Sequence, residues 1–143
     1  MTASPRLYKV MFVCIGNSCR SPMAEAIAAT KHADLFEPCS AGVAPATIVQ
    51  PSTLRCLEEK GFRLDPAKQP QRIETSPWRE MDVIVNMSGA GILPFLPGYK
   101  GANLIWEVAD PMGQPMSAYR TARDRIELHV DKLAKMLRSH RGA

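Results

Sequence analysis

The amino-acid sequence predicts an α/β fold: a parallel sheet with helices on both faces, formed by one domain spanning residues 1–143. Short strand-like runs alternate along the chain with segments of helical character, which is the pattern of parallel β-α-β units. A chain of 143 residues has the usual length of one domain, and its 45% hydrophobic content is sufficient for one core. The chain contains no internal repeat, linker or low-complexity tract.

Four runs are the candidate strands. Residues 7–13 (Leu-Tyr-Lys-Val-Met-Phe-Val) are mostly apolar, as expected of a strand buried on both faces of a parallel sheet. Residues 82–87 are the clearest of the later strands, and residues 102–106 form another. Residues 37–43 are a weaker candidate that leads into Ser40-Ala-Gly42.

Three segments are predicted to be helices. The first begins at Ser21-Pro22, a pair typical of an N-cap and a first helical position, and continues to about residue 31. The second covers residues 52–60 and ends at Gly61, a normal C-terminal glycine. The third starts near residue 117, where apolar residues recur at helical spacing. Residues 63–77 are polar and contain three prolines, so we expect a long surface loop there.

Composition excludes several classes of protein. No apolar run is long enough to cross a bilayer and no secretory signal is present, so we expect a cytoplasmic protein with reduced cysteines and no membrane partner. The net charge of +4 suits an anionic ligand, but acidic residues interleave with the basic ones after residue 116. That pattern favours an ion-paired helix face over a nucleic-acid surface. The three histidines lack metal-ligand spacing, and we expect neither a metal nor a cofactor.

The most informative feature is Cys14, followed after five intervening residues by Arg20-Ser21, between a predicted strand and a predicted helix. The positive end of a helix and a nearby guanidinium favour a thiolate. Backbone N–H groups of a tight loop at a helix N-terminus can bind a phosphate dianion, and Gly16 lets the backbone approach it closely. A bidentate arginine can bind two oxygens of a phosphoryl group in the transition state. Ser21 can donate a hydrogen bond to the thiolate.

The run Val13-Cys-Ile-Gly-Asn-Ser-Cys-Arg-Ser-Pro-Met-Ala-Glu25 resembles the signature of the low-molecular-weight protein tyrosine phosphatase family, which also contains thioredoxin-coupled arsenate reductases. The resemblance continues through residues 40–42, 82–85 and 106–111. It implies a four-stranded parallel sheet flanked by helices, with a phosphate-binding loop between strand 1 and helix 1. It also implies hydrolysis of phosphomonoesters, including phosphorylated proteins, through a phosphocysteine on Cys14. The phosphate-binding residues would be Ile15, Gly16, Asn17, Ser18, Cys19 and Arg20.

A leaving alkoxide or phenoxide needs a proton, so the chemistry also requires a general acid. By the resemblance this acid is Asp110, the aspartate of the Asp110-Pro111 pair, although this dipeptide is also common in simple turns. Asn17 and Ser40 would brace the phosphate-binding loop by hydrogen bonds. Cys19 could form a disulfide with Cys14 under oxidation, to be reversed by thioredoxin or a small thiol.

The substrate stays open on the sequence alone. Tyrosine phosphatases of the family often have aromatic residues where this chain has residues 43–47 and Met112-Gly113. Trp106 or Tyr99 could substitute, although such a residue is more often a core or rim aromatic. Ser18 resembles the threonine of the phosphoarginine-directed branch. Residues 40–61 resemble the arsenate reductase branch, but no cysteine follows Cys56, so such a reductase would need an external thiol. A phosphate-binding scaffold without turnover is the non-enzymatic alternative.

Overall fold

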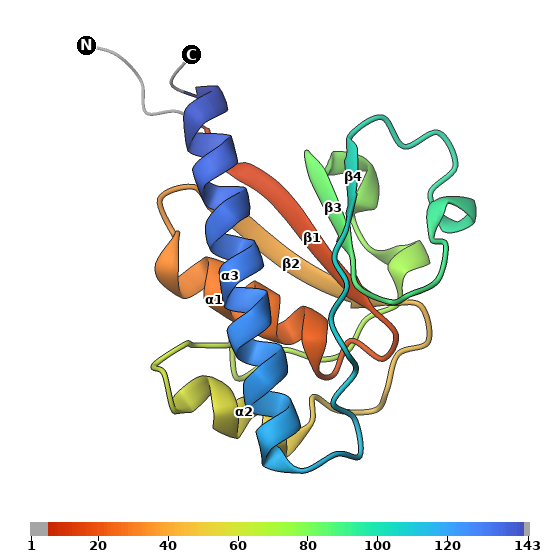
Figure 1. Cartoon of the computed structure of the whole chain (residues 1–143). Helices are drawn as coiled ribbons and strands as arrows, with labels where there is room; N and C mark the ends of the chain where they lie inside the picture. Colours follow the sequence, from red (N-terminus) through yellow and green to blue (C-terminus); the bar gives the residue numbers. More distant parts are fainter. Residues whose placement is uncertain (1–5, 142–143) are drawn as a thin grey trace.

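The computed structural model describes residues 6–141 and contains one four-stranded sheet, in which all neighbouring strands are parallel. The strand order is β2-β1-β3-β4, with β1 and β3 at the centre (Figure 1). The strands are β1 (Tyr8–Cys14), β2 (Phe36–Gly42), β3 (Val83–Asn86) and β4 (Ala102–Ile105). The predicted α/β fold with a four-stranded parallel sheet is confirmed.

The three α-helices pack on one face of the sheet (Figure 1). Val10 and Phe12 of β1 face them and join side chains of all three helices in the larger core cluster. The helices are α1 (Arg20–Lys31), α2 (Pro51–Glu58) and α3 (Met116–Arg141). Each lies within a few residues of its predicted range, and Gly61 follows α2 with a φ of 71°, as a C-terminal glycine does.

The opposite face of the sheet is covered by short 3-10 helices and loops, whereas the alternating sequence pattern predicts helices on both faces. Met11 and Val13 of β1 pack there against residues from short 3-10 helices and the loops around them. These 3-10 helices are η1 (Ile73–Thr75), η2 (Trp78–Glu80) and η3 (Leu93–Phe95). Helices therefore lie on both faces, but the α-helices are all on one of them.

Residues 63–77 are mostly exposed, as predicted for a surface loop, but their last part packs against the sheet. Ile73 is fully buried in the second core cluster. Arg72 forms a parallel bridge with Gly42, and the Gly42 N–H donates to the Gln71 carbonyl at 2.8 Å. This segment therefore lies beside the carboxyl end of β2, next to the predicted phosphate-binding loop.

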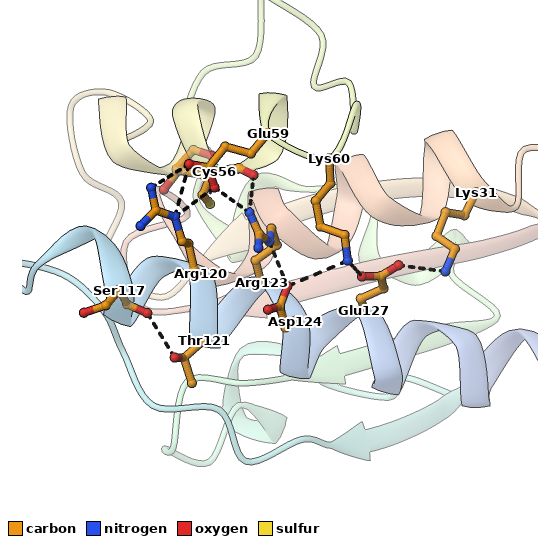
Figure 2. Close-up of polar contacts among 11 residues, drawn as sticks. Lys31, Cys56, Glu59, Lys60, Ser117, Arg120, Thr121, Arg123, Asp124 and Glu127 are labelled. Carbon is orange, nitrogen blue, oxygen red and sulfur yellow. Dashed lines mark hydrogen bonds and ion pairs between the residues drawn. The ribbon is translucent and has the colours of Figure 1, made fainter.

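Ion pairs join α3 to the other two helices (Figure 2). Arg120 and Arg123 both bind Glu59 just after α2, at 2.7 and 2.8 Å. Glu127 binds Lys60 and also Lys31, the last residue of α1. Three basic residues of α3 are thus paired with acids of neighbouring elements: Arg120, Arg123 and Arg138. Within residues 6–141, no helix has the length and apolar content that crossing a membrane requires.

Candidate active site

The loop between β1 and α1 is bound along its outer edge by the segment 43–50. Four of its carbonyl oxygens accept backbone N–H groups of that segment at 2.9–3.2 Å: those of Cys14, Ile15, Gly16 and Ser18. In a trans peptide the carbonyl and the following N–H point in opposite directions, so the next N–H group in each case points to the inside of the loop. Asn17 adopts a φ of 51°, the left-handed conformation typical of such anion-binding nests. The loop can therefore bind an anion through its backbone.

Cys14 is the last residue of β1 and is 2% exposed. Its Sγ lies 2.9 Å from the Ser21 hydroxyl and accepts the Ser21 N–H at 3.4 Å. Ser21 was expected to cap α1, but the helix already begins at Arg20, and its N-cap residue is Cys19, which makes no side-chain cap hydrogen bond. The first turn of α1 thus directs an N–H and a hydroxyl at the sulfur, an arrangement that stabilises a thiolate.

Arg20 is 5% exposed, and its guanidinium is held along one edge. Its Nη1 donates to the carbonyl oxygens of Met87 at 2.6 Å and Val108 at 3.0 Å, which follow β3 and β4. Its Nη2 lies 3.5 Å from an Asp110 carboxylate oxygen. Its buried Nε has no hydrogen-bond partner among residues 6–141. One edge of the guanidinium is therefore fixed by backbone, and the Nε donor remains unused.

Asp110 lies at the mouth of a pocket of about 220 Å³ that Cys14 and Arg20 also line. Its side chain is 40% exposed. One carboxylate oxygen accepts the Met112 N–H at 3.0 Å, and so holds the turn at Asp110-Pro111. The other oxygen faces Arg20. Asp110 can therefore hold this turn and place a carboxylate beside the pocket at the same time.

Asn17 joins the loop to both neighbouring segments. Its Nδ2 donates to the hydroxyls of Ser21 and Ser40, each at 2.9 Å. Its Oδ1 accepts the backbone N–H of Gln71 at 2.9 Å. The structure therefore brings together Asn17, Ser21 and Ser40, as the sequence motif suggested. Gln71 is an addition that the sequence did not indicate, because its backbone makes the contact and its segment has no periodic pattern.

Gly42, at the end of β2, allows the loop to approach the sheet. A Cβ at this position would lie 2.6 Å from the Ile15 carbonyl oxygen and 2.9 Å from the Asn17 nitrogen. Both atoms belong to the loop backbone, so neither can move aside as a flexible side chain could. The Ser40-Ala-Gly42 motif thus contributes a brace through Ser40 and close packing through Gly42.

A family model described as low molecular weight phosphotyrosine protein phosphatase matches residues 9–142. The chain belongs to this family. It is a cysteine-based enzyme of a superfamily whose members include phosphatases and arsenate reductases.

Similar proteins include an arginine phosphatase and an arsenate reductase. A protein-arginine-phosphatase of Geobacillus stearothermophilus is 32% identical over 149 aligned residues, covering 92% of this chain and 97% of the relative. A glutaredoxin arsenate reductase of Synechocystis is 34% identical over 128 residues, covering 87% and 95%. The solved structure of an arginine phosphatase from Geobacillus stearothermophilus superposes with a TM-score of 0.82 at 30% identity, covering 93% of this chain and 94% of that one. The family is thus certain, and the relatives differ in their reactions.

The four cysteines are all free thiols, and burial raises the pKa of three of them. Burial raises the pKa of the Cys19 thiol, whose Sγ lies 3.9 Å from the Tyr119 hydroxyl. Burial also raises the pKa of Cys39 to about 12 and that of Cys56 to about 11. Cys39 Sγ contacts the Met81 sulfur, and Cys56 is a buried residue of α2. Neither lines the pocket of Cys14.

Among the described residues, no aromatic side chain lines the pocket that contains Cys14. Trp106 packs against Phe12 and stacks on His129, and Tyr99 packs against Trp78. Trp106 and Tyr99 therefore do not replace the missing aromatic wall of this pocket, and each takes the alternative place of a core or rim aromatic. Aliphatic side chains border the mouth instead: Ile15, Ala44, Ala46 and Met112. Within residues 6–141, no three His, Cys, Asp or Glu side chains are grouped so that they could hold a metal ion.

Proposed function

We propose that this protein is a phosphatase that hydrolyses phosphate esters through a covalent phosphocysteine on Cys14. The proposal is supported above all by one pocket that contains the Cys14 sulfur, the Arg20 guanidinium and the Asp110 carboxyl. A buried donor without an acceptor costs about 1–3 kcal/mol. A phosphoryl oxygen bound to the Arg20 Nε would remove this cost, so the pocket is suited to a tetrahedral oxyanion.

In the first step, the Cys14 thiolate attacks phosphorus and the bond from phosphorus to the ester oxygen breaks. The backbone N–H groups of residues 15–20 and the free edge of Arg20 bind the equatorial oxygens, where negative charge increases in the transition state. The protonated Asp110 carboxyl gives its proton to the leaving oxygen. The products are the phosphocysteine and a free alcohol or phenol. With phosphoarginine the bond from phosphorus to the guanidino nitrogen breaks instead, Asp110 protonates that nitrogen, and free arginine leaves.

In the second step, water attacks the phosphocysteine. The Asp110 carboxylate, now deprotonated, takes a proton from this water as its oxygen bonds to phosphorus. The bond between sulfur and phosphorus breaks, its electron pair returns to Cys14, and inorganic phosphate leaves. Ser21 donates a hydrogen bond to the departing thiolate. The sequence of steps needs no metal or redox cofactor.

A phosphorylated protein side chain is the proposed substrate, and phosphotyrosine and phosphoarginine are the two candidates. The aliphatic mouth of the pocket offers no ring on which a tyrosine could stack. The Geobacillus relative at 32% identity is an arginine phosphatase. Ser18 places a small hydroxyl residue in the loop, as that branch does. These observations favour a flexible substrate side chain over a flat aromatic one.

Arsenate reduction is the other candidate, because the Synechocystis relative is an arsenate reductase. It would require an external thiol as reductant, since Cys39 and Cys56 lie outside the pocket and Cys19 is a buried thiol of raised pKa. A general acid beside the pocket is of more use in ester cleavage, where a poor leaving group must be protonated. We therefore place phosphate hydrolysis first.

The test is metal-free hydrolysis of an activated aryl phosphate by the natural chain and by Cys14→Ser, followed by comparison of phosphotyrosine and phosphoarginine peptides. Turnover by the natural chain and loss in Cys14→Ser would support the phosphatase. Absence of hydrolysis, with Cys14-dependent arsenate reduction in the presence of glutathione, would assign the chain to the reductases. Absence of both reactions would favour a phosphate-binding scaffold.

A further inference from the structure

A second, larger cleft of about 800 Å³ adjoins the active-site pocket and takes no part in the proposed chemistry. Arg20 lines both of them. Ala109 lines the cleft, and Asp110, the next residue along the chain, lines the pocket. A phosphorylated side chain fills the pocket, so the backbone that carries this side chain must lie outside it. The cleft is a neighbouring surface on which this backbone can continue.

Two strongly exposed apolar side chains border the cleft. Ile105, the last residue of β4, is 71% exposed, the highest value for a large apolar side chain within residues 6–141. Leu93, the first residue of η3, is 59% exposed. Apolar side chains that gather on the surface beside an active site are typical of a surface that a binding partner covers.

The strand β4 also has a row of backbone groups without partners. It is the last strand of the sheet, and three of its four residues are exposed (Figure 1). Its inner edge pairs with β3, where the Trp106 N–H donates to the Asn86 carbonyl at 3.0 Å. Backbone groups of successive strand residues point to opposite edges, so those of Asn103 and Ile105 point outward. Within residues 6–141, no other strand pairs with this outer edge.

The two edges of the sheet differ in their protection. Proteins usually protect an exposed edge strand with charged residues, proline or a bulge, because such an edge readily pairs with another chain. β2, the opposite edge strand, contains Glu37 and Pro38. β4 has the sequence Ala-Asn-Leu-Ile and pairs with β3 in regular register, so it has none of these features. The edge beside the active site is therefore the one that is open to pairing.

We propose that the outer edge of β4 and the adjoining cleft bind an extended segment of the phosphorylated protein substrate. The segment pairs with β4 as an added strand and places an apolar side chain against Leu93 and Ile105. Strand addition is a common mode of peptide recognition, in which main-chain hydrogen bonds give affinity and alternate side chains enter pockets. The inference rests on the proposed function and assigns its substrate class: polypeptides rather than small phosphomonoesters.

The reach and the charge of the cleft fit this occupant. Asp110 follows Ile105 by five positions. An extended chain of five residues spans at most about 18 Å, so the docked segment lies within about six residues of the phosphorylated one. Apart from Arg20, the cleft lining has one basic and one acidic side chain, so it is not selective for an anion. Unpaired backbone groups that alternate along a strand match a polypeptide.

The test compares an aryl phosphate with phosphotyrosine and phosphoarginine peptides. Each peptide carries alternating threonine and valine over about six residues, either before or after the phosphorylated residue. We expect one of the two flanks to raise kcat/KM of the natural chain roughly tenfold or more over the free phosphorylated amino acid. A tenfold gain corresponds to about 1.4 kcal/mol.

Ile105→Lys adds the charge that protects other edge strands and removes the apolar contact. We expect it to lower the ratio of peptide to aryl phosphate kcat/KM roughly tenfold, most of the gain given by the flank. Leu128→Lys is the matched control, since Leu128 on α3 is 64% exposed and does not line the cleft. It should leave the ratio unchanged. Thermal unfolding shows whether each variant folds, and Leu93→Lys provides the test if Ile105→Lys does not.

Methylation of backbone nitrogens in the peptide tests the pairing itself. A strand that pairs along one edge uses every second N–H group. N-methylation at one set of alternate positions should therefore abolish the gain, and methylation at the other set should preserve it. A simple apolar contact would show no such alternation.

The proposal is overturned if neither flank improves turnover, if Ile105→Lys and Leu128→Lys change the ratio equally, or if N-methylation has no alternating effect. In each case the natural chain would still hydrolyse the aryl phosphate. A natural chain that hydrolyses neither the aryl phosphate nor any phosphopeptide would instead refute the proposed function.

Discussion

Gly42 and Ile15 are in close backbone contact: a Cβ at Gly42 would lie 2.6 Å from the Ile15 carbonyl oxygen. We therefore predict that Gly42→Ala displaces the phosphate-binding loop. A displacement of about 1 Å in a catalytic group can cost about 100-fold in rate, and overpacking costs about 1–3 kcal/mol of stability. Turnover of an aryl phosphate and urea unfolding would measure the two effects.

Gly91→Ala is the control for this prediction. Gly91 has open space around its Cα, and its φ is not in the left-handed region, so an added methyl group meets no atom within 4 Å. We expect Gly91→Ala to retain its activity and stability. Normal activity of Gly42→Ala would show that the loop tolerates a shift in this contact.

Asp110→Asn should slow turnover most for substrates with poor leaving groups. The Asp110 carboxyl borders the pocket beside Arg20, and a positioned general acid contributes roughly 100- to 10,000-fold. We expect a loss in this range for an alkyl phosphate and a much smaller one for an activated aryl phosphate. Glu107→Gln, which removes an exposed carboxylate outside this pocket, is the control. Equal losses across leaving groups would remove Asp110 as the acid.

Glu59→Gln should make stability less sensitive to acid. Hydrogen bonds from Arg120 and Arg123 lower the pKa of Glu59 to about 2, below its ordinary value of about 4.3. A carboxyl whose folded pKa is lowered stabilises the fold above the unfolded pKa, and this stability is lost as pH falls toward the folded value. The natural chain should therefore lose this contribution between about pH 4.5 and pH 2.

Urea unfolding of the natural chain and Glu59→Gln across this pH range would measure the difference. Glu58→Gln is the control, since Glu58 is exposed and has no ion pair within residues 6–141. The prediction fails if the difference in unfolding free energy between the natural chain and Glu59→Gln stays constant from pH 5 to pH 2.

Cys19→Ser should leave turnover near normal but prevent recovery from oxidation. Hydrogen peroxide converts the Cys14 thiolate to a sulfenic acid, and the Cys19 thiol can condense with it to form a disulfide and water. This disulfide protects Cys14 from irreversible oxidation, and thioredoxin or a small thiol can reduce it. The measurement is the activity regained with dithiothreitol after a peroxide pulse. The same recovery in both proteins would refute a protective role of Cys19.

Most of the fold could be predicted because its signals are local. The apolar run of β1 and the helical spacing of α3 are each evident within a short window of sequence. The cover of the second face could not be predicted in the same way. Residues such as Ile73 and Ile92 belong to short 3-10 turns and loops, whose burial depends on contacts with distant strands.

The residues of the candidate site could likewise be predicted from spacing only where they lie close together in the sequence. Cys14, Arg20 and Ser21 are found together in the sequence because one tight loop holds all three. Gln71 reaches this loop from a distant segment, and no spacing rule connects it to the motif. Ser21 shows the opposite error: local propensity predicted a helix cap, but its hydroxyl faces the Cys14 sulfur.

The most direct test of the account is to detect the phosphocysteine. The natural chain would be quenched with acid during turnover of an aryl phosphate, digested, and examined by mass spectrometry for a phosphate on the peptide that contains Cys14. We predict phosphorylation of Cys14 in the natural chain and no phosphorylated peptide in Cys14→Ala. Turnover without any covalent phosphate on Cys14, or turnover that survives Cys14→Ala, would contradict the mechanism.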